Sequence, residues 1–270
     1  MEALKINQIS SPKQLHIYLE HFSEADIEFF LTECSKKYYN SDKEIINDKN
    51  FDRILDYLSN KYPKNNFLKK IGASIDTHSK IKLPYFLGSM NKKKTIEQVN
   101  KWKEDYNGEI IISDKLDGVS FLLEYSNTEK KLYTRGNGYY GKDISNMLQF
   151  INLPELKTQD KFVIRGEILI SKKNYSTILE ESSNSRSFVS GITNIKKIYK
   201  RKKDIEKLDL VTYELIEPIL KPKDQLKFLK EKGFKVVKNI FKKNLDIDFL
   251  DDYLVKRKSN SKYEIDGVII

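Results

Sequence analysis

The feature that most constrains how this chain can fold is a change in the spacing of its apolar residues near residue 78. Before that point apolar residues recur at helical spacing, and two polar helix starts precede them. Ser23-Glu24-Ala25-Asp26 has the Ser-x-x-acid form of a capping box, and Asn47-Asp48 can cap the next helix. These patterns predict a small helical domain over residues 1–78.

Beyond residue 78 the apolar residues occur in short alternating runs, as they do in strands. Helical spacing returns at 223–232, which Gly233 ends, and at 245–256. The fold class predicted is α+β, with antiparallel sheets flanked by helices over residues 79–270. An apolar strand at 263–270 is an unusual place for a chain to stop, so we expect this second domain to be C-terminally incomplete. The other expected strands are 109–113, 119–125, 131–134, 162–170 and 208–216, with a hairpin turn at 127–130.

The charge balance favours a polyanionic partner. The chain holds 49 Lys and Arg against 39 Asp and Glu, a net charge of +10, which suits nucleic acid through phosphate contacts. A lysine-rich coding bias that decorates any solvated surface is the alternative. No run of 18 apolar residues and no secretory signal occur, so we expect an intracellular, cytoplasmic protein without a membrane partner. One cysteine, Cys34, and three histidines exclude an internal disulfide and a zinc site of usual spacing.

The strongest chemical candidate is Lys115-Leu116-Asp117-Gly118, directly after the strand expected at 109–113. A lysine at a strand end, followed by an acid and by a glycine that lets the backbone turn close to a ligand, suits an amine that attacks a phosphate. The amine must be neutral when it attacks. For the tetrapeptide alone, a chance turn with a solvated lysine is the alternative.

Four further motifs follow in order: TRGNG from residue 134, RGE from 165 at the head of a strand, VTYE from 211 and EIDGVII from 264. Each could be a glycine turn, a strand-edge charge pair, a core tyrosine or a last strand. Their joint order and spacing, however, resemble those of the covalent nucleotidyltransferases, and within them the NAD-dependent DNA ligases, over nearly the whole chain. The resemblance implies an ATP-grasp-like nucleotidyltransferase domain.

The resemblance also implies roles for individual side chains. Lys115 matches the lysine that becomes adenylated, and Asp117 with Gly118 completes that motif. The run TRGNGYYGKDIS from Thr134 is similar to the family's Thr-Arg-Gly-Asp-Gly-x-x-Gly-Glu-Asp segment. The remaining roles are a nucleotide or nick contact for Arg135, a ribose contact for Glu167, a phosphate contact for Arg186 in Asn-Ser-Arg, adenine stacking for Tyr213, and lysine orientation or Mg²⁺ binding for Asp266.

The helical domain bears on the cofactor. Tyr38-Tyr39, Asp48 and Phe51-Asp52 resemble the module with which NAD-dependent ligases grip the nicotinamide mononucleotide (NMN) half of NAD. Aromatic rings can stack on nicotinamide, and the two acids, four residues apart, share a helix face and can accept hydrogen bonds. An ordinary amphipathic hairpin with capping acids is the alternative. Further on, the segment from Leu83 looks like the family's Pro-Met-Leu-Ser-Leu stretch and places Ser89 and Met90 near the dinucleotide.

Several positions depart from the family pattern. Tyr39 and Phe51 stand where the family has histidine and tyrosine, and Ser113 replaces a glutamate whose contact to adenine only Asp114 could restore. A second arginine of the family is Asn194 here, with Lys196 and Lys197 as candidate substitutes. Such drift suggests a divergent branch, with viruses as a candidate source. The basic run at 196–203 is either a DNA-backbone contact or a solvated loop.

The sequence thus predicts the adenylation portion of an NAD-dependent DNA ligase, acting with Mg²⁺ in replication and repair. Lys115 attacks NAD, forms lysyl-AMP and releases NMN, and the AMP passes to the 5′-phosphate of nicked double-stranded DNA. We expect a monomer. The rivals are an ATP-dependent polynucleotide ligase, a GTP-using capping-type nucleotidyltransferase, and a non-catalytic DNA-binding relic; the helical domain and the intact Lys115 argue against them.

Overall fold

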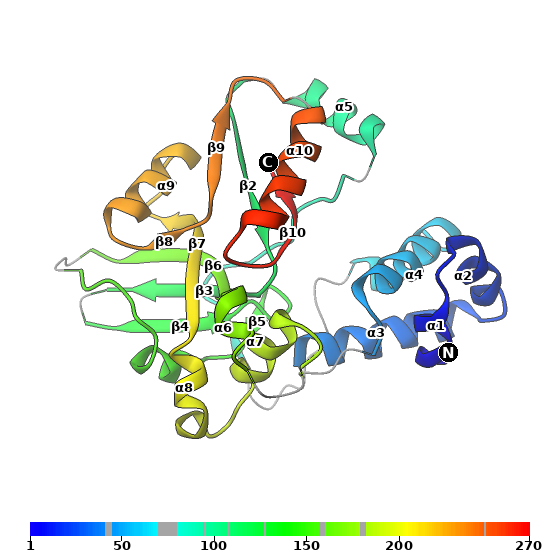
Figure 1. Ribbon diagram of the computed structural model, residues 1–270, viewed down its shortest axis with the longest axis horizontal. Helices are drawn as coiled ribbons and strands as arrows, with labels where there is room; N and C mark the ends of the chain where they lie inside the picture. The colour runs from blue at the N-terminus through cyan, green and yellow to red at the C-terminus, as the bar shows by residue number, and fades with distance from the viewer. Residues whose placement is uncertain are drawn as a thin grey trace.

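The helical part of the chain has a core of its own. The computed structural model describes residues 1–40, 45–69, 80–93, 95–106, 108–126, 128–156, 160–178, 182–245 and 247–270, so the boundary expected at residue 78 lies outside them. Buried residues from Ile6 to Phe67 pack together without a contribution from the sheets. These helices stand apart from the sheets in Figure 1. They are α1 (Ala3–Gln8), α2 (Pro12–Leu19), α3 (Glu24–Asn40), α4 (Asp48–Lys61) and the 3-10 turn η1 (Asn66–Lys69).

Both predicted helix starts are confirmed. The Ser23 Oγ accepts a hydrogen bond from the Asp26 backbone N–H at 3.2 Å, while the Asp26 carboxylate accepts one from the Ser23 N–H at 3.0 Å. This reciprocal pair is the capping box. At the next start the Asn47 side chain accepts from the Asn50 N–H at 2.9 Å. Local side-chain chemistry therefore sets where α3 and α4 begin.

Two sheets form the rest of the fold. A three-stranded sheet has the order β10 (Ile265–Ile269), β2 (Ile110–Leu116), β9 (Asn239–Lys242). A five-stranded sheet has the order β4 (Lys130–Thr134), β3 (Val119–Tyr125), β6 (Phe162–Ile170), β7 (Leu208–Glu217), β8 (Lys235–Val236). All pairs are antiparallel except β7 with β8, which is parallel and departs from the wholly antiparallel expectation. The short strands β1 (Ile81–Lys82) and β5 (Tyr140–Gly141) pair separately.

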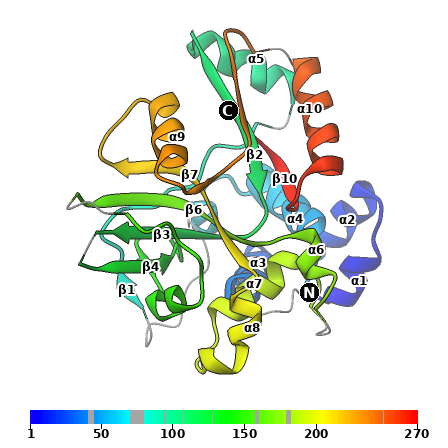
Figure 2. The same ribbon diagram turned by 60° about the vertical axis from the view of Figure 1, so that its left-hand side comes forward.

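Helices cover both sheets (Figures 1 and 2). The helices α5 (Ile96–Asp105) and α10 (Ile247–Asn260) pack on the three-stranded sheet around Ile112. The largest core lies on one face of the five-stranded sheet. The elements on that side include η3 (Ser145–Gln149), α6 (Lys172–Tyr175), α7 (Ser185–Thr193), η4 (Ile198–Arg201), α8 (Lys202–Ile205) and α9 (Pro222–Glu231). No helix within the described residues is long and apolar enough to cross a bilayer.

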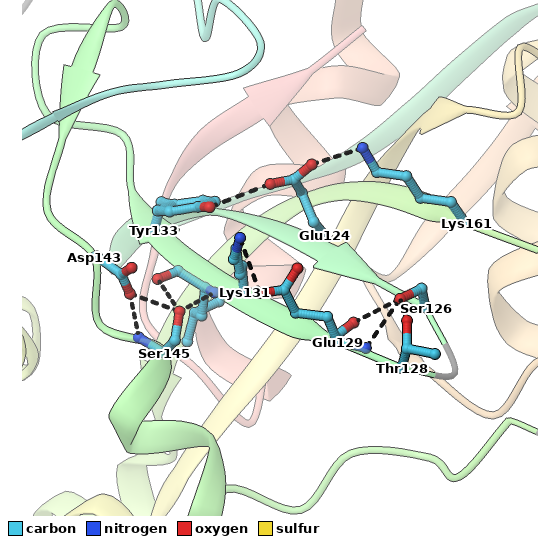
Figure 3. Close-up of polar contacts among 10 residues, drawn as sticks. Glu124, Ser126, Thr128, Glu129, Lys131, Tyr133, Asp143, Ser145 and Lys161 are labelled. Atoms are coloured by element: carbon cyan, nitrogen blue, oxygen red, sulfur yellow. Dashed lines mark hydrogen bonds and ion pairs between the residues drawn. The ribbon is translucent and has the colours of Figure 1, made fainter.

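The β3–β4 hairpin shows how polar contacts hold the turn and the strand register (Figure 3). Its turn is closed by the Ser126 N–H, which donates to the Glu129 carbonyl at 2.9 Å. Across the pair, the Tyr133 hydroxyl donates to Glu124 at 3.2 Å, and Lys161 forms an ion pair with the same carboxylate at 2.7 Å. The hairpin expected at 127–130 is therefore present, although Asn127 lies outside the described residues.

Two local expectations were wrong. The strand expected to end at residue 113 continues as β2 to Leu116, so Lys115 lies inside the strand rather than after it. Likewise Arg165-Gly166-Glu167 occupies the middle of β6 rather than its head. Pairing with β10 extends β2 through the polar residues before Leu116, which lack a strand's apolar pattern. The limits of β6 agree with the strand expected at 162–170, and only the place of Glu167 within it differs.

Candidate active site

The tetrapeptide Lys115-Leu116-Asp117-Gly118 joins the two sheets, because β2 ends at Leu116 and β3 begins at Val119. The chain passes against β6 at this junction. A Cβ added to Gly118 would lie 2.2 Å from the Ile168 carbonyl oxygen and 2.9 Å from the Glu167 Cγ. Glycine is therefore required by a close backbone approach, which brings the end of the tetrapeptide against Glu167 on the neighbouring sheet.

Lys115 is paired with Asp266. Strands β2 and β10 run antiparallel with Lys115 opposite Gly267 and Leu116 opposite Ile265, so Asp266 is the extra residue of a β-bulge. Its carboxylate accepts a hydrogen bond from the Lys115 ammonium. Burial opposes ionisation of Asp266, but the bond and charge of Lys115, with Lys92 and Arg186, hold the pKa of Asp266 below its usual range. The bulge thus places the Asp266 carboxylate against the Lys115 ammonium, and the orientation of the lysine for reaction stays a prediction for Asp266.

Neighbours of Lys115 along β2 point to opposite faces, as strand residues do. Asp114 is 4% exposed and accepts hydrogen bonds from α10: from the Tyr253 hydroxyl at 3.1 Å and from Arg257 Nε and Nη2 at 3.1 and 2.9 Å. It is fully engaged on that side. The possibility that Asp114 replaces the glutamate missing at Ser113 is therefore contradicted, because its carboxylate anchors α10 instead.

Glu167 projects from the middle of β6, on the same side as Ser120 across the sheet. The Ser120 hydroxyl donates to its carboxylate at 2.9 Å, and the Tyr213 hydroxyl of β7 lies 3.5 Å from it. Only 6% of Glu167 is exposed. Burial raises the pKa of Glu167, while Arg186, Ser120 and Arg135 oppose the rise. A buried carboxylate among cations is a strong acceptor for a hydroxyl group that enters the site.

Arg186 links the tetrapeptide to α7. Its Nη1 lies 3.2 Å from Asp117 Oδ1, and its charge reaches both Glu167 and Asp266. The Asn184 side chain accepts from the Ser187 N–H at 2.8 Å and caps α7 two residues before Arg186. The first turn of a capped helix thus presents this arginine at the centre of the site.

Arg135 enters from the loop after β4. Its backbone N–H donates to the Ser120 carbonyl at 2.9 Å, and its charge acts on Glu167. Gly136 and Gly138 have φ of +55° and +91°, in the left-handed region that glycine tolerates. The Leu87 N–H donates to the Gly138 carbonyl at 3.0 Å. This turn therefore brings the segment around Leu87 to the site.

Ser89 and Met90 follow that contact directly, and 58% of Met90 is exposed. The preceding Gly88 carbonyl accepts from Arg165 Nη2 at 2.6 Å. The Arg165 guanidinium carbon also lies 5.8 Å from the centre of the Tyr213 ring. The segment thus lies over a face of the five-stranded sheet, where Leu87 packs with Leu122 and Val163.

The helical module approaches this segment through α4. Asp52 forms an ion pair with Lys92, with Nζ 3.2 and 3.3 Å from its two carboxylate oxygens. Phe51 is partly buried against the helical core. Tyr38 and Tyr39 lie on α3 and Asp48 begins α4, but their side chains fall outside what the structure describes. Asp48 and Asp52 both belong to α4, and their shared helix face stays a prediction.

Sequence reasoning missed Lys142. Its ammonium donates to Asn194 Oδ1, so this side chain brings a cation to the position where an arginine was expected. Lys196 and Lys197, the expected substitutes, are exposed. The signal was available, because the same run TRGNGYYGKDIS carries lysine where the family has glutamate. In the run 196–203, Ile198 is buried, while 73% of Tyr199 is exposed.

The described part of the chain does not form a metal site by itself. Among the described residues no group of three or more His, Cys, Asp or Glu side chains could hold an ion. Asp266, half-exposed beside Lys115, offers a single carboxylate. Such a site suits Mg²⁺ only where phosphates and water complete the coordination, which is the usual pattern for that ion.

The chain is similar to DNA ligases of viruses and bacteria. The model of the NAD-dependent DNA ligase adenylation domain family matches residues 87–270. A DNA ligase of Acanthamoeba polyphaga mimivirus is 42% identical over 98% of this chain and 42% of its own length. A putative DNA ligase of Invertebrate iridescent virus 6 is 32% identical over 86% of this chain and 38% of its own length. A DNA ligase of Clostridioides difficile is 29% identical over 87% of this chain and 39% of its own length.

The chain therefore spans about two fifths of the length of these curated relatives. The two viral relatives agree with the divergent viral branch that the departures suggested. The matched region begins at residue 87 and includes the tetrapeptide, Glu167, Arg186, Tyr213 and Asp266.

Proposed function

Because this chain belongs to the NAD-dependent DNA ligase family, we propose that Lys115 takes AMP from NAD as the first step in sealing nicked double-stranded DNA. The observation that carries the proposal is the convergence of five side chains on the junction between the two sheets. Lys115 pairs with Asp266, Arg186 pairs with Asp117, and Arg186 also acts on the buried Glu167. A bound nucleotide would bring its phosphate to the two cations, Lys115 and Arg186, and its ribose to Glu167.

The reaction is an in-line displacement at the adenylyl phosphorus. The neutral Lys115 amine forms the N–P bond while the bond to the NMN phosphate oxygen breaks and leaves its electron pair on that oxygen. The proton that the amine loses passes to solvent. Asp266 holds the lysine in line with the bond that breaks, and Arg186 stabilises the negative charge that develops on the phosphate.

Three residues hold the adenosine in this proposal. Glu167 accepts a hydrogen bond from a ribose hydroxyl, Tyr213 stacks on the adenine, and Arg135 contacts the nucleotide. The burial of Glu167 and its place beside the Tyr213 hydroxyl support these roles, because a ribose and its base are adjoining groups. Ser113, Ser89 and Met90 would lie around the same nucleotide.

The helical module would hold the NMN half, through Tyr38, Tyr39, Asp48, Phe51 and Asp52. Asp52 forms an ion pair with Lys92, which follows Met90 by two residues, and this contact between α4 and the segment around Met90 supports the role. Mg²⁺, bound by Asp266 together with the NAD phosphates, would neutralise charge on those phosphates. Nicked DNA would then receive the AMP on its 5′-phosphate.

The intact mass of the chain tests the proposal. The chain is incubated with NAD and Mg²⁺, and in parallel with ATP, with GTP and without nucleotide. We expect a gain of one AMP with NAD alone. A gain with ATP or GTP instead would assign another nucleotide, and no gain with any nucleotide would support a non-catalytic role.

A further inference from the structure

Lys92 connects the two parts of the chain. It follows Ser89 and Met90 in the segment that leads from β1 to α5, and its ammonium lies 3.2 Å from Asp52 Oδ1 on α4. The side chains are 59% and 41% exposed. An ion pair in that setting contributes little to stability, because water competes for both charges. The pair can therefore open at little cost when another anion approaches Lys92.

Lys92 also acts on the reaction centre. Its charge is one of those that favour the ionised form of Asp266, the partner of Lys115. Since such an influence weakens with distance, Lys92 lies within electrostatic range of that pair while it touches Asp52. Lys92 thus stands between the proposed nucleophile and the proposed NMN-binding helix.

A dinucleotide that reacts at this site must span the distance between Lys115 and α4. Its adenylyl phosphorus has to meet Lys115, and its nicotinamide half has to reach α4, so the phosphate that leaves with NMN passes between them. That phosphate gains negative charge as the bond to the adenylyl phosphorus breaks. A flexible lysine with a compact charge suits a phosphate whose charge changes during a reaction.

We propose that Lys92 exchanges Asp52 for the phosphate of the NMN half when NAD binds, and that it stabilises this phosphate as it leaves. The inference rests on the proposed function and adds a residue to it. Lys92 remains protonated throughout, and the electron pair of the breaking P–O bond stays on the phosphate oxygen that Lys92 contacts. Asp52 is released to accept a hydrogen bond from the nicotinamide riboside portion.

The experiment compares two ligands that differ by one phosphate. Binding of NMN and of nicotinamide riboside is measured by calorimetry for the wild-type chain and for Lys92→Ala, Lys92→Arg and Lys93→Ala. Lys93 is exposed next to Lys92 and provides the matched control. Because a hydrogen bond between charged groups is lost, Lys92→Ala should weaken NMN binding by about 10- to 100-fold. Riboside binding should stay within about twofold in every variant, because it carries no phosphate.

Lys92→Arg should keep most of the NMN affinity, and Lys93→Ala should match the wild type. Equal weakening of both ligands by Lys92→Ala would overturn the proposal, since Lys92 would then act only by placing Asp52. Unchanged NMN binding in Lys92→Ala, or no measurable binding of NMN by the wild type, would overturn it too. AMP uptake from NAD by the wild type is measured in parallel, so failure of the proposed function is recognised separately.

Discussion

The Lys115 ammonium donates a hydrogen bond to the Asp266 carboxylate across a β-bulge that places the two side chains together. The lysine is half-exposed at the junction of two sheets, and its partner holds it toward the site rather than toward the core. Its chemistry can therefore be tested without a large effect on folding.

Lys115→Ala should abolish the AMP adduct and leave the thermal unfolding curve close to that of the wild type. The side chain supplies the nucleophile, and a half-exposed lysine contributes little to a core. Intact mass after incubation with NAD measures the first effect, and circular dichroism measures the second. Lys93→Ala is the control that should retain the adduct, and an adduct that persists in Lys115→Ala would place the nucleophile elsewhere.

Gly118→Ala should disrupt the junction itself. The new methyl carbon would lie 2.2 Å from the Ile168 carbonyl oxygen, which is backbone and cannot rotate away. The strands β3 and β6 would have to separate, at a cost on the order of 1–3 kcal/mol. Urea unfolding measures this loss. Gly108→Ala is a useful comparison, because its methyl carbon would meet nothing within 4 Å although its φ of +121° carries strain. Equal stability of Gly118→Ala and the wild type would contradict the close approach.

Glu167→Gln should leave the chain at least as stable as the wild type at pH 7 while it slows AMP uptake. Burial raises the pKa of Glu167, so folding opposes the charged form and stability falls as pH rises above the unfolded value of about 4.3. Glutamine carries no charge, so the free-energy cost of burying a carboxylate at neutral pH is removed. Below about pH 4 the acid is protonated in both states and the advantage should vanish.

Thermal unfolding at the two pH values, with AMP uptake at pH 7, separates these effects. A Glu167→Gln chain that is less stable than the wild type at pH 7 would show that the carboxylate is retained for folding rather than for substrate.

Asp52→Ala should slow AMP uptake from NAD by about 10- to 100-fold, because the lost acceptor is proposed to contact the departing half of the dinucleotide. Transfer of AMP from a preloaded chain to nicked DNA should change far less. Asp56→Ala provides the control one turn along α4. Equal losses in both steps would instead indicate a structural role for Asp52.

Asp209→Asn should lower stability on the order of 1–3 kcal/mol at pH 7. This buried carboxylate of β7 pairs with Lys235 and accepts from the Tyr263 hydroxyl at 2.6 Å and from Lys262 at 2.9 Å, which ties the start of β10 to the five-stranded sheet. Burial opposes its ionisation, but these three partners hold the pKa of Asp209 below its usual range.

Because the folded-state pKa is depressed, the stabilisation is present above the unfolded value of about 3.9 and is lost as pH falls through the folded value. Acid unfolding followed by fluorescence of Trp102 should therefore show a smaller pH dependence for Asp209→Asn than for the wild type. An identical acid transition would indicate that other carboxylates dominate it.

The sequence alone determined the local features and the chemistry of the site. Predictable from the sequence were the capping box at Ser23, the N-cap at Asn47 and the strand limits of β3 and β6. Hydrogen bonds to nearby backbone and alternating burial depend on adjacent residues. The order of motifs from Lys115 to Asp266 can likewise be read from the sequence. The family followed from the same motifs.

The tertiary structure decided which of these residues meet. Asp114 contacts α10 while Lys115 pairs with Asp266, and Lys142 reaches Asn194. Lys92 pairs with Asp52, and its charge acts on Asp266. These interactions join residues 40 to 174 positions apart. The helix α5 and the strand β9 were likewise missed, since α5 has no buried residue of its own and β9 is partly exposed. Packing against partners distant in the sequence, rather than local preference, gives these segments their structure and these side chains their roles.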